Sequence, residues 1–454
     1  MQVSKQGRSV LQMAAGMASG AETASDIVED TLAAIAANKD PAIFTVVTSA
    51  RARAEASAAT LRIREGKPLS LLDGIPVAWK DLYAFEGETT RAGSAILDDG
   101  PAQADAELVR RLGMAGAVAV GKVNMTEFAF SGLGLNPHHG TPRNPWSGDE
   151  ARIPGGSSSG SGVAVACGIV PVSIGTDTSG SVRIPAALNG VVGYKTSGER
   201  WPLAGAFPLS RTLDTAGVLS HTVADAVIVD AAVRQLAAPD LRRVAPKGVR
   251  VIVPENVVWD DVAPAVGRNF EVALARLQEL GVVVERRSLR VFDDVSSLGS
   301  RHGLLVSIEA FQLHRERLAT SSAKQMDVRV RQRLQAGGKI DPMSERAIRE
   351  ARPVLIGQMD TFFDGNTFIA FPTVSETAPL LAPLEQDDEL FAKTNARMLR
   401  NTMIGSFLGW CGVSIPNGVD ESGLPTAFLL SGGPGHDGAL LSAAMGMEPA
   451  IRTG

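Results

Sequence analysis

Short apolar segments alternate with helical segments through the first half of the chain, and this alternation limits the folds that the sequence can adopt. Apolar and β-branched residues gather in residues 71–82, 117–120 and 171–175, each suited to one short buried strand. Helical patterns at about 104–114 and at 161–170 separate these segments. Buried strands that alternate with helices predict an α/β fold in which helices cover both faces of a central sheet.

The rest of the chain is predicted to complete one domain around this sheet. Residues 1–65 are expected to form N-terminal helices, and residues 66–234 and 366–454 the core of the domain. Residues 235–365 are richer in Arg, Glu and Gln, which predicts a peripheral, mostly helical insertion. Because no repeat, low-complexity tract or long linker divides the sequence, residues 1–454 are expected to be a single domain.

Charge and composition exclude several classes of protein. The chain has 44 Lys plus Arg against 49 Asp plus Glu, so it lacks the basic excess of a nucleic-acid groove. Two cysteines and six scattered histidines provide neither a disulfide framework nor the spacing of a zinc site. No apolar run approaches the roughly 18 residues that span a bilayer, and the start lacks the apolar core of a signal peptide. We therefore expect a cytoplasmic protein that uses no metal, nucleic acid or membrane.

The most unusual stretch, residues 154–162, is rich in Ser and Gly, and a second such stretch occupies residues 175–183. A flexible linker fits poorly because an apolar segment follows at once. A phosphate loop would need a G-K-[ST] sequence, which is missing. Residues 156–160 match the G-x-S-x-G pattern of a nucleophile elbow, but residues 152–154 make a poor strand end. Loops at strand ends and helix starts present nucleophiles and backbone N–H donors, so these two loops are the candidate site.

A serine nucleophile needs a base, and the sequence offers a lysine for this role. No histidine lies near either loop, although a histidine distant in sequence stays possible. Lys80 ends the apolar segment that includes Trp79, and burial there would lower its pKa toward neutrality. A lysine at a strand end is more often solvated or salt-bridged, so both roles stay open at this point.

Taken together, the motifs resemble those of the amidase signature family. GGSSSGS at 155–161 and GTDTSGSVRIPAALNGVVG at 175–193 match the family's GGSSGGS and GTDTGGS-[IV]-R-x-P-A patterns. LDGIPVAWKDLYAFEG at 72–87 is similar to its L-x-G-I-P-x-x-x-K-D segment, and GLPTAFLLSGGPGHDGALL at 423–441 also matches. The resemblance spans most of the chain apart from 235–365. It implies the amidase signature fold, an α/β fold with a central mixed β-sheet flanked by helices on both faces.

The resemblance implies a Ser–cis-Ser–Lys triad. Carried over position by position, the nucleophile falls on Ser181, the bridging serine on Ser157 and the base on Lys80. Neutral Lys80 would take the proton of Ser157, which in turn takes the proton of Ser181 as it attacks the carbonyl carbon. The peptide bond before Ser157 is implied to be cis. The acyl-enzyme would form on Ser181 without a metal or an organic cofactor.

The resemblance also implies roles for neighbouring residues. The oxyanion hole would be formed by consecutive backbone N–H groups, those of Thr178, Ser179, Gly180 and Ser181. One loop is expected to contact the substrate, formed by Ala129, Phe130, Ser131 and Gly132. Ser158, Asp177 and Arg183 are expected to support the loops rather than react. Ser179 stands where the family usually has glycine, so its backbone is expected to avoid positive φ or to accept strain.

The implied function is hydrolysis of a small-molecule amide, with a primary amide as first choice, releasing ammonia or an amine. An alternative is the glutaminase subunit of a tRNA-dependent amidotransferase, which requires partner chains. A catalytically silent scaffold is a third hypothesis, which retention of Lys80, Ser157 and Ser181 disfavours. Homodimers are common in the family, so a homodimer is a further expectation. An anionic substrate would need a pocket arginine, for which the candidates are Arg91, Arg143, Arg152 and Arg211.

Overall fold

A computed structural model describes residues 7–452 of the protein. Its strands are β1 (Phe44–Val47), β2 (Pro76–Lys80), β3 (Val118–Val123), β4 (Val172–Thr176), β5 (Val192–Lys195), β6 (Ala216–Ser220), β7 (Arg250–Pro254), β8 (Val283–Arg287), β9 (Thr367–Pro372), β10 (Cys411–Val419) and β11 (Pro425–Gly432). In this described range they form one eleven-stranded sheet in the order β1-β3-β2-β4-β6-β5-β10-β11-β9-β7-β8. The sheet is mixed, because β2 runs parallel to β3 and β4 whereas β10 is antiparallel to β5 and β11.

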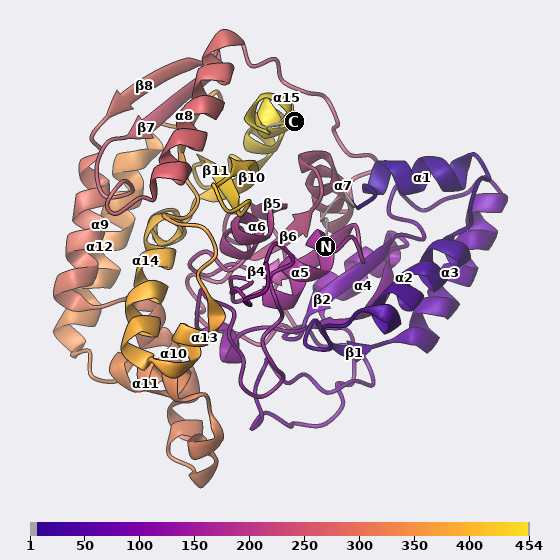
Figure 1. Ribbon diagram of the computed structural model, residues 1–454, viewed down its shortest axis with the longest axis horizontal. Helices are drawn as coiled ribbons and strands as arrows, with labels where there is room; N and C mark the ends of the chain where they lie inside the picture. The colour runs from indigo at the N-terminus through magenta and orange to yellow at the C-terminus, as the bar shows by residue number, and fades with distance from the viewer. Residues whose placement is uncertain (1–6, 453–454) are drawn as a thin grey trace.

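Helices pack along the whole sheet (Figure 1). Those of the first half are α1 (Val10–Ala18), α2 (Ala24–Ala37), α3 (Ser49–Arg64), α4 (Glu107–Met114), α5 (Ser159–Ala166), α6 (Arg183–Asn189) and α7 (Val223–Val233). Those of the second half are α8 (Pro264–Glu279), α9 (Arg290–His302), α10 (Leu305–Leu318), α11 (Val328–Gly337), α12 (Pro342–Asp360), α13 (Leu381–Gln386), α14 (Asp388–Phe407) and α15 (Asp437–Ile451). No helix between residues 7 and 452 is long and apolar enough to cross a membrane.

The central strands are buried on both faces. Along β2, Val77 and Trp79 belong to the apolar core on one side, whereas Ala78 between them belongs to the core on the other side. Alternate side chains of a strand point to opposite faces, so a strand that is apolar throughout needs cover on both. Helices α4 and α7 contribute to the core of Val77, and α2, α3 and α5 contribute to that of Ala78.

One N-terminal segment corrects the expectation that residues 1–65 are helices. Phe44–Val47 forms β1, which pairs antiparallel with β3 at the edge of the sheet. Its sequence, Phe-Thr-Val-Val, consists of aromatic and β-branched residues that favour strands. A run of four residues is too short for periodicity to separate a strand from a helix turn, and pairing with β3 decides its conformation.

Residues 235–365 also contribute to the sheet. Strands β7 and β8 pair in parallel, and β7 pairs with β9 of the core, so the insertion extends the sheet at one edge. The remaining segment forms helices α8 to α12. In Figure 1, α9 and α12 lie at the opposite end of the molecule from the N-terminal helices α2 and α3.

Parallel strands β2 and β4 position the candidate site. Their last residues, Lys80 and Thr176, lie at the same edge because carboxyl ends of adjacent parallel strands point the same way. The first Ser/Gly loop leads directly into α5 at Ser159, and the second leads into α6 at Arg183. The fold therefore brings both loops and the lysine to one corner.

Candidate active site

Lys80 and Ser157, far apart in the sequence, are hydrogen-bonded in the structure. Lys80 Nζ donates to Ser157 Oγ at 2.7 Å and to Thr176 Oγ1 at 2.8 Å. The side chains of Lys80 and Ser157 are both completely buried. The peptide bond between Gly156 and Ser157 is cis, as the family resemblance implies. The structure thus joins two of the three residues expected to react.

Burial changes the acidity of Lys80. Loss of water around the ammonium group lowers the pKa of Lys80 to about 7, although the carboxylates of Asp214 and Asp177 partly oppose this shift. No salt bridge to Lys80 occurs within residues 7–452. The neighbouring lysine of β3 differs, because Lys122 pairs with Asp81 at 2.7 Å. A lysine with a pKa near neutrality has a large uncharged fraction at pH 7, which is the form that accepts a proton.

Ser181 lies in the loop between β4 and α6, close to the first Ser/Gly loop. The Ser158 N–H donates to the Ser181 carbonyl at 3.2 Å, which ties the two loops together. The Ser158 hydroxyl points elsewhere, to the Thr176 carbonyl at 3.4 Å. In the described part of the chain, no hydrogen bond joins the Ser157 and Ser181 hydroxyls. The second step of the implied relay is therefore not preformed, as is common for catalytic contacts that tighten only with substrate.

A buried ion pair shapes the nucleophile loop. Arg183 Nη2 and Nε donate to the two carboxylate oxygens of Asp177, both at 2.9 Å. Burial alone would raise the pKa of Asp177, but the Arg183 guanidinium outweighs it and lowers this pKa to about 2. Asp177 also accepts the N–H of Gly180 at 2.6 Å and that of Val182 at 3.2 Å. The carboxylate thus fixes the backbone on both sides of Ser181.

The expected oxyanion donors are not equivalent. The Gly180 N–H is occupied by Asp177, so the structure corrects the expectation that Gly180 is a free donor. The N–H groups of Thr178, Ser179 and Ser181 donate to no such acceptor between residues 7 and 452 and are open to a substrate.

The backbone conformation explains two residue choices in this loop. Gly180 has a φ of 137°, and a Cβ there would collide with the Thr402 hydroxyl. Ser179 is not among the residues with positive φ, so a serine replaces the family's usual glycine without backbone strain.

The loop expected to contact the substrate divides into two parts. Ala129, Phe130 and Ser131 line the same cavity as Ser181. Ala129 has a φ of 59°, a conformation that costs energy for a residue with a side chain and is held by the surrounding structure.

Gly132 has a different environment from its three predecessors. Its N–H donates to Asn395 Oδ1 at 2.8 Å, and its carbonyl accepts the Gly156 N–H at 2.8 Å. Gly132 is not among the residues that line the cavity, so the structure places it behind the Ser157 loop rather than against a substrate.

Sequence reasoning missed two polar residues that contact the site. Thr176 accepts a hydrogen bond from Lys80, and Asp214 accepts one from Thr178 Oγ1 at 2.6 Å. Burial raises the pKa of Asp214 from its usual range. Both residues lie in matched motifs, GTDT at 175–178 and LDTAG at 213–217. No group of three His, Cys, Asp or Glu suited to a metal ion occurs in residues 7–452.

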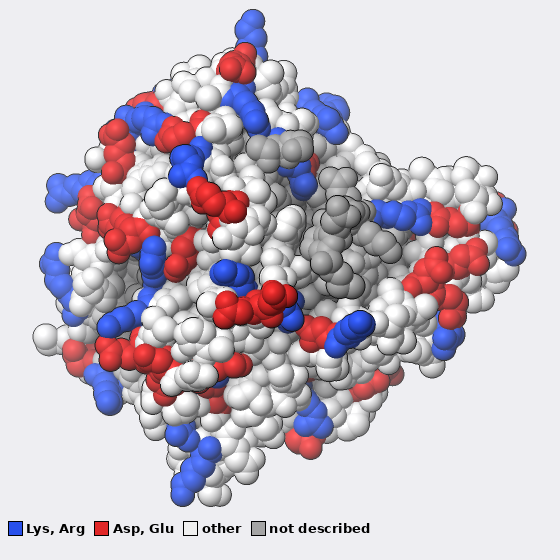
Figure 2. Space-filling model, in the orientation of Figure 1, with Lys and Arg blue, Asp and Glu red and all other residues white. Residues whose placement is uncertain are grey.

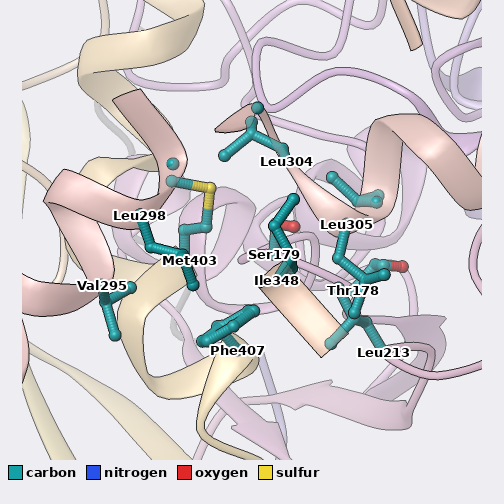
Figure 3. A pocket seen from close by; sticks show the side chains of 13 residues that line it. Thr178, Ser179, Leu213, Val295, Leu298, Leu304, Leu305, Ile348, Met403 and Phe407 are labelled. Carbon is teal, nitrogen blue, oxygen red and sulfur yellow. The ribbon is translucent and has the colours of Figure 1, made fainter. Parts of the chain in front are cut away.

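Apolar side chains of the insertion form a wall beside the nucleophile loop. In Figure 3 they surround Thr178 and Ser179, together with side chains of α14: Val295, Leu298, Leu305, Ile348, Met403 and Phe407. The insertion is therefore not only peripheral. Its helical periodicity shows which face is apolar but not whether that face meets the core or a cavity.

Three of the four candidate arginines make contacts away from Ser181. Arg91 faces Asp98, Arg143 donates to Gly148 and Asp149, and Arg152 donates to Ala378. The fourth, Arg211, lines an adjoining cavity with Asp214 and Thr176. Instead, Arg333 of α11 lines the cavity of Ser181. Sequence reasoning missed Arg333 because it lies in the segment outside the family motifs.

A family model described as Amidase matches residues 26–441 of this chain. The chain belongs to the amidase signature family. Members of this family are amide-cleaving hydrolases, so this amidase is an enzyme of that class. The family predicted from the motifs is thereby confirmed.

Individual relatives cover nearly the whole amidase. It is 37% identical to 2-amino-5-chloromuconic acid deaminase of Comamonas testosteroni, over 94% of this chain and 92% of that protein. It is 33% identical to a subunit of the glutamyl-tRNA(Gln) amidotransferase of Anaeromyxobacter sp. (strain K), over 96% and 94%. A solved crystal structure of an amidase aligns with a TM-score of 0.87 and 31% identity, over 98% of this chain and 100% of that chain. The predicted α/β fold, a mixed sheet flanked by helices, is confirmed.

Proposed function

We propose that this amidase hydrolyses a small-molecule amide, with a primary amide as first candidate, through an acyl-enzyme on Ser181. The observation that carries the proposal is the 2.7 Å hydrogen bond from buried Lys80 to Ser157. The pKa of this lysine, lowered by burial to about 7, suits a base that works at neutral pH.

In the proposed reaction the proton moves along a relay. Neutral Lys80 accepts the proton of Ser157, and Ser157 accepts that of Ser181 as Ser181 Oγ attacks the carbonyl carbon. Free N–H groups of Thr178 and Ser179 would stabilise the oxyanion, each by roughly 3 kcal/mol. When the C–N bond breaks, the relay returns the proton to the leaving nitrogen, which departs as ammonia from a primary amide. Water then hydrolyses the ester and regenerates Ser181.

The cavity and the surface support a small substrate. The cavity beside Ser181 has a volume of about 250 Å³, which suits a molecule of a few non-hydrogen atoms better than a polymer. On the face shown in Figure 2, Lys and Arg are interspersed with Asp and Glu instead of forming one basic surface. Binding to nucleic acid usually depends on such a basic surface.

The test is ammonia release by the purified chain from glutamine, malonamate, biuret, indoleacetamide and benzamide. Ser181→Ala serves as the blank, and intact mass spectrometry follows the acyl-enzyme during turnover. We expect turnover of at least one amide, an adduct on Ser181, and neither in the variant. An adduct mapped to Ser157 or Ser158 would overturn the assignment of the nucleophile.

A glutaminase subunit is the second candidate function, favoured by the 33% identity to a chain of a glutamyl-tRNA(Gln) amidotransferase. Such a subunit would release ammonia from glutamine alone among the amides tested, and efficiently only with its partner chains. Light scattering of the purified chain, with and without a cell extract's co-purifying proteins, distinguishes a homodimer from a mixed assembly. Turnover of a non-glutamine amide by the isolated chain would argue against this candidate.

A further inference from the structure

Arg333 is a cation at the active site that lacks a carboxylate partner. It lies on α11, donates one hydrogen bond to the Phe130 carbonyl, and places Cζ 4.1 Å from the centre of the Phe130 ring. Within residues 7–452 no carboxylate lies at ion-pair distance from it. A guanidinium carries five N–H donors, so this arrangement leaves most of them available.

Other arginines with little exposure are paired with carboxylates. Arg183 contacts Asp177 at 2.9 Å and Arg200 contacts Asp230 at 2.6 Å. On the same helix as Arg333, one turn earlier, Arg329 contacts its own aspartate at 2.8 Å. A guanidinium that is partly removed from water is costly unless an anion compensates it, so the bare state of Arg333 calls for a partner.

The surroundings of Arg333 suit an anion from outside the chain. It lines the cavity of Ser181, whose other walls include the apolar side chains of Leu209, Val306 and Leu399. No Asp or Glu is among the described residues that line this cavity. Burial lowers the pKa of Arg333 to about 10, so the side chain is still charged at neutral pH. Apolar walls strengthen the attraction between this charge and an anion compared with water.

We infer that Arg333 binds a carboxylate of the substrate, so that the enzyme acts on small amides that carry a carboxylate, such as monoamides of dicarboxylic acids. This inference rests on the proposed hydrolysis at Ser181. The planar guanidinium can hold a carboxylate through two parallel hydrogen bonds and thereby orient the amide carbon toward Ser181 Oγ. Breaking the C–N bond then consumes one water and yields ammonia and the dicarboxylic acid.

Arg211 is the competing arginine, and its surroundings are less suited to an anion. It is exposed and lines the adjoining cavity, which does not include Ser181. The carboxyl group of Asp214 lines that same cavity and, when ionised, would repel a carboxylate.

The test compares amides that differ in one group. Succinamate carries a carboxylate where butyramide carries a methyl group, and malonamate and propionamide form a second pair. We expect the wild type to prefer the acid of each pair. In Arg333→Gln, kcat/KM for succinamate should fall by about 100-fold, the range expected for a lost charge-assisted pair, whereas butyramide changes by less than about 3-fold.

Two further variants keep this test specific. Arg333→Lys preserves the charge without the fork and should recover part of the loss. Arg331→Gln is the matched control, because Arg331 lies on the same helix but donates to the Ala323 carbonyl, away from the cavity. No preference for the acids in the wild type, or a loss that follows Arg211→Gln instead of Arg333→Gln, would overturn the inference. Thermal unfolding of each variant verifies its fold.

A binding experiment separates failure of this inference from failure of the proposed function. Calorimetry measures the affinity of succinate and malonate for Ser181→Ala protein, with and without Arg333→Gln. If no amide is turned over but dicarboxylate binding depends on Arg333, the hydrolytic proposal fails and the carboxylate site stands. If amides are hydrolysed while neither dicarboxylate binds through Arg333, the carboxylate site is wrong and the hydrolytic proposal stands.

Discussion

The two sides of the cavity around Ser181 come from different parts of the chain and are built differently. On the side of the family motifs, Lys80 and Ser157 are fixed by hydrogen bonds and the loop of Asp177 by a buried ion pair. On the side of the insertion, helices α9 to α12 supply aliphatic side chains and one bare cation, Arg333.

This difference separates reaction from selection. Hydrogen bonds and proton transfer depend on individual atoms within about 3 Å, so the motif side tolerates little change. Apolar contacts depend on area and shape, and aliphatic residues of similar volume can replace one another. We therefore expect changes on the motif side to abolish bond cleavage, and changes on the insertion side to alter which amide binds.

The largest effect is expected from Lys80→Ala, which removes the proposed base. We expect kcat/KM to fall by at least about 10³-fold, in the upper range for loss of general base catalysis. Lys80→Arg should be equally inactive, because arginine stays charged at neutral pH. Near-wild-type turnover in Lys80→Ala that is verified as folded would contradict this role.

The pH dependence of the wild type is the next largest effect. Because the base must be neutral and burial lowers the pKa of Lys80 to about 7, kcat/KM should rise with pH up to about 7 and level off above it. Well below that pH, each unit should change the rate by about tenfold. A profile measured from pH 5 to 9 checks this, and a flat profile would contradict it.

A smaller loss is expected from Ser157→Ala. The value of kcat/KM should fall by about 100-fold and leave a residual rate, because a water can partly bridge Lys80 and Ser181. Ser159→Ala is the matched control, since the buried Ser159 hydroxyl donates to the Asn124 carbonyl and does not contact the lysine. Equal losses in the two variants would show that loop structure, and not proton relay, is being measured.

The smallest effect is expected on the insertion side, from Leu298→Ala. Leu298 of α9 lines the apolar wall shown in Figure 3. Its truncation should raise KM for benzamide by about 3- to 10-fold with kcat nearly unchanged, as expected when binding is lost equally in ground and transition states. A proportional fall in kcat would mean that the wall also positions the reacting groups.

Much of the fold followed from local patterns, whereas edge elements did not. Strands β2 and β4 were predicted because a strand that is buried on both faces is apolar throughout. Strand β1 was missed because four residues carry too little periodicity, and β8 because its residues are partly exposed and charged at the sheet edge. Such strands are decided by the neighbour with which they pair.

The candidate site shows the same division. Lys80, Ser157 and Ser181 followed from motif resemblance, and the structure places them at one corner of the sheet. Gly180 did not behave as expected, because hydrogen-bond direction depends on the turn that Asp177 imposes on the loop. Arg333 could not be found from sequence, because helix α11 carries several arginines and only packing shows which one reaches Ser181.

By itself the sequence determined which groups are available: the apolar strands, the two Ser/Gly loops and a lysine at a strand end. These are properties of residue type and short-range spacing. The tertiary structure decided how those groups act, because the pKa of Lys80 depends on complete burial and the charge of Arg333 on the absence of a neighbouring carboxylate in the cavity lining that the structure describes. Desolvation and charge pairing arise only when segments distant in the chain exclude water together.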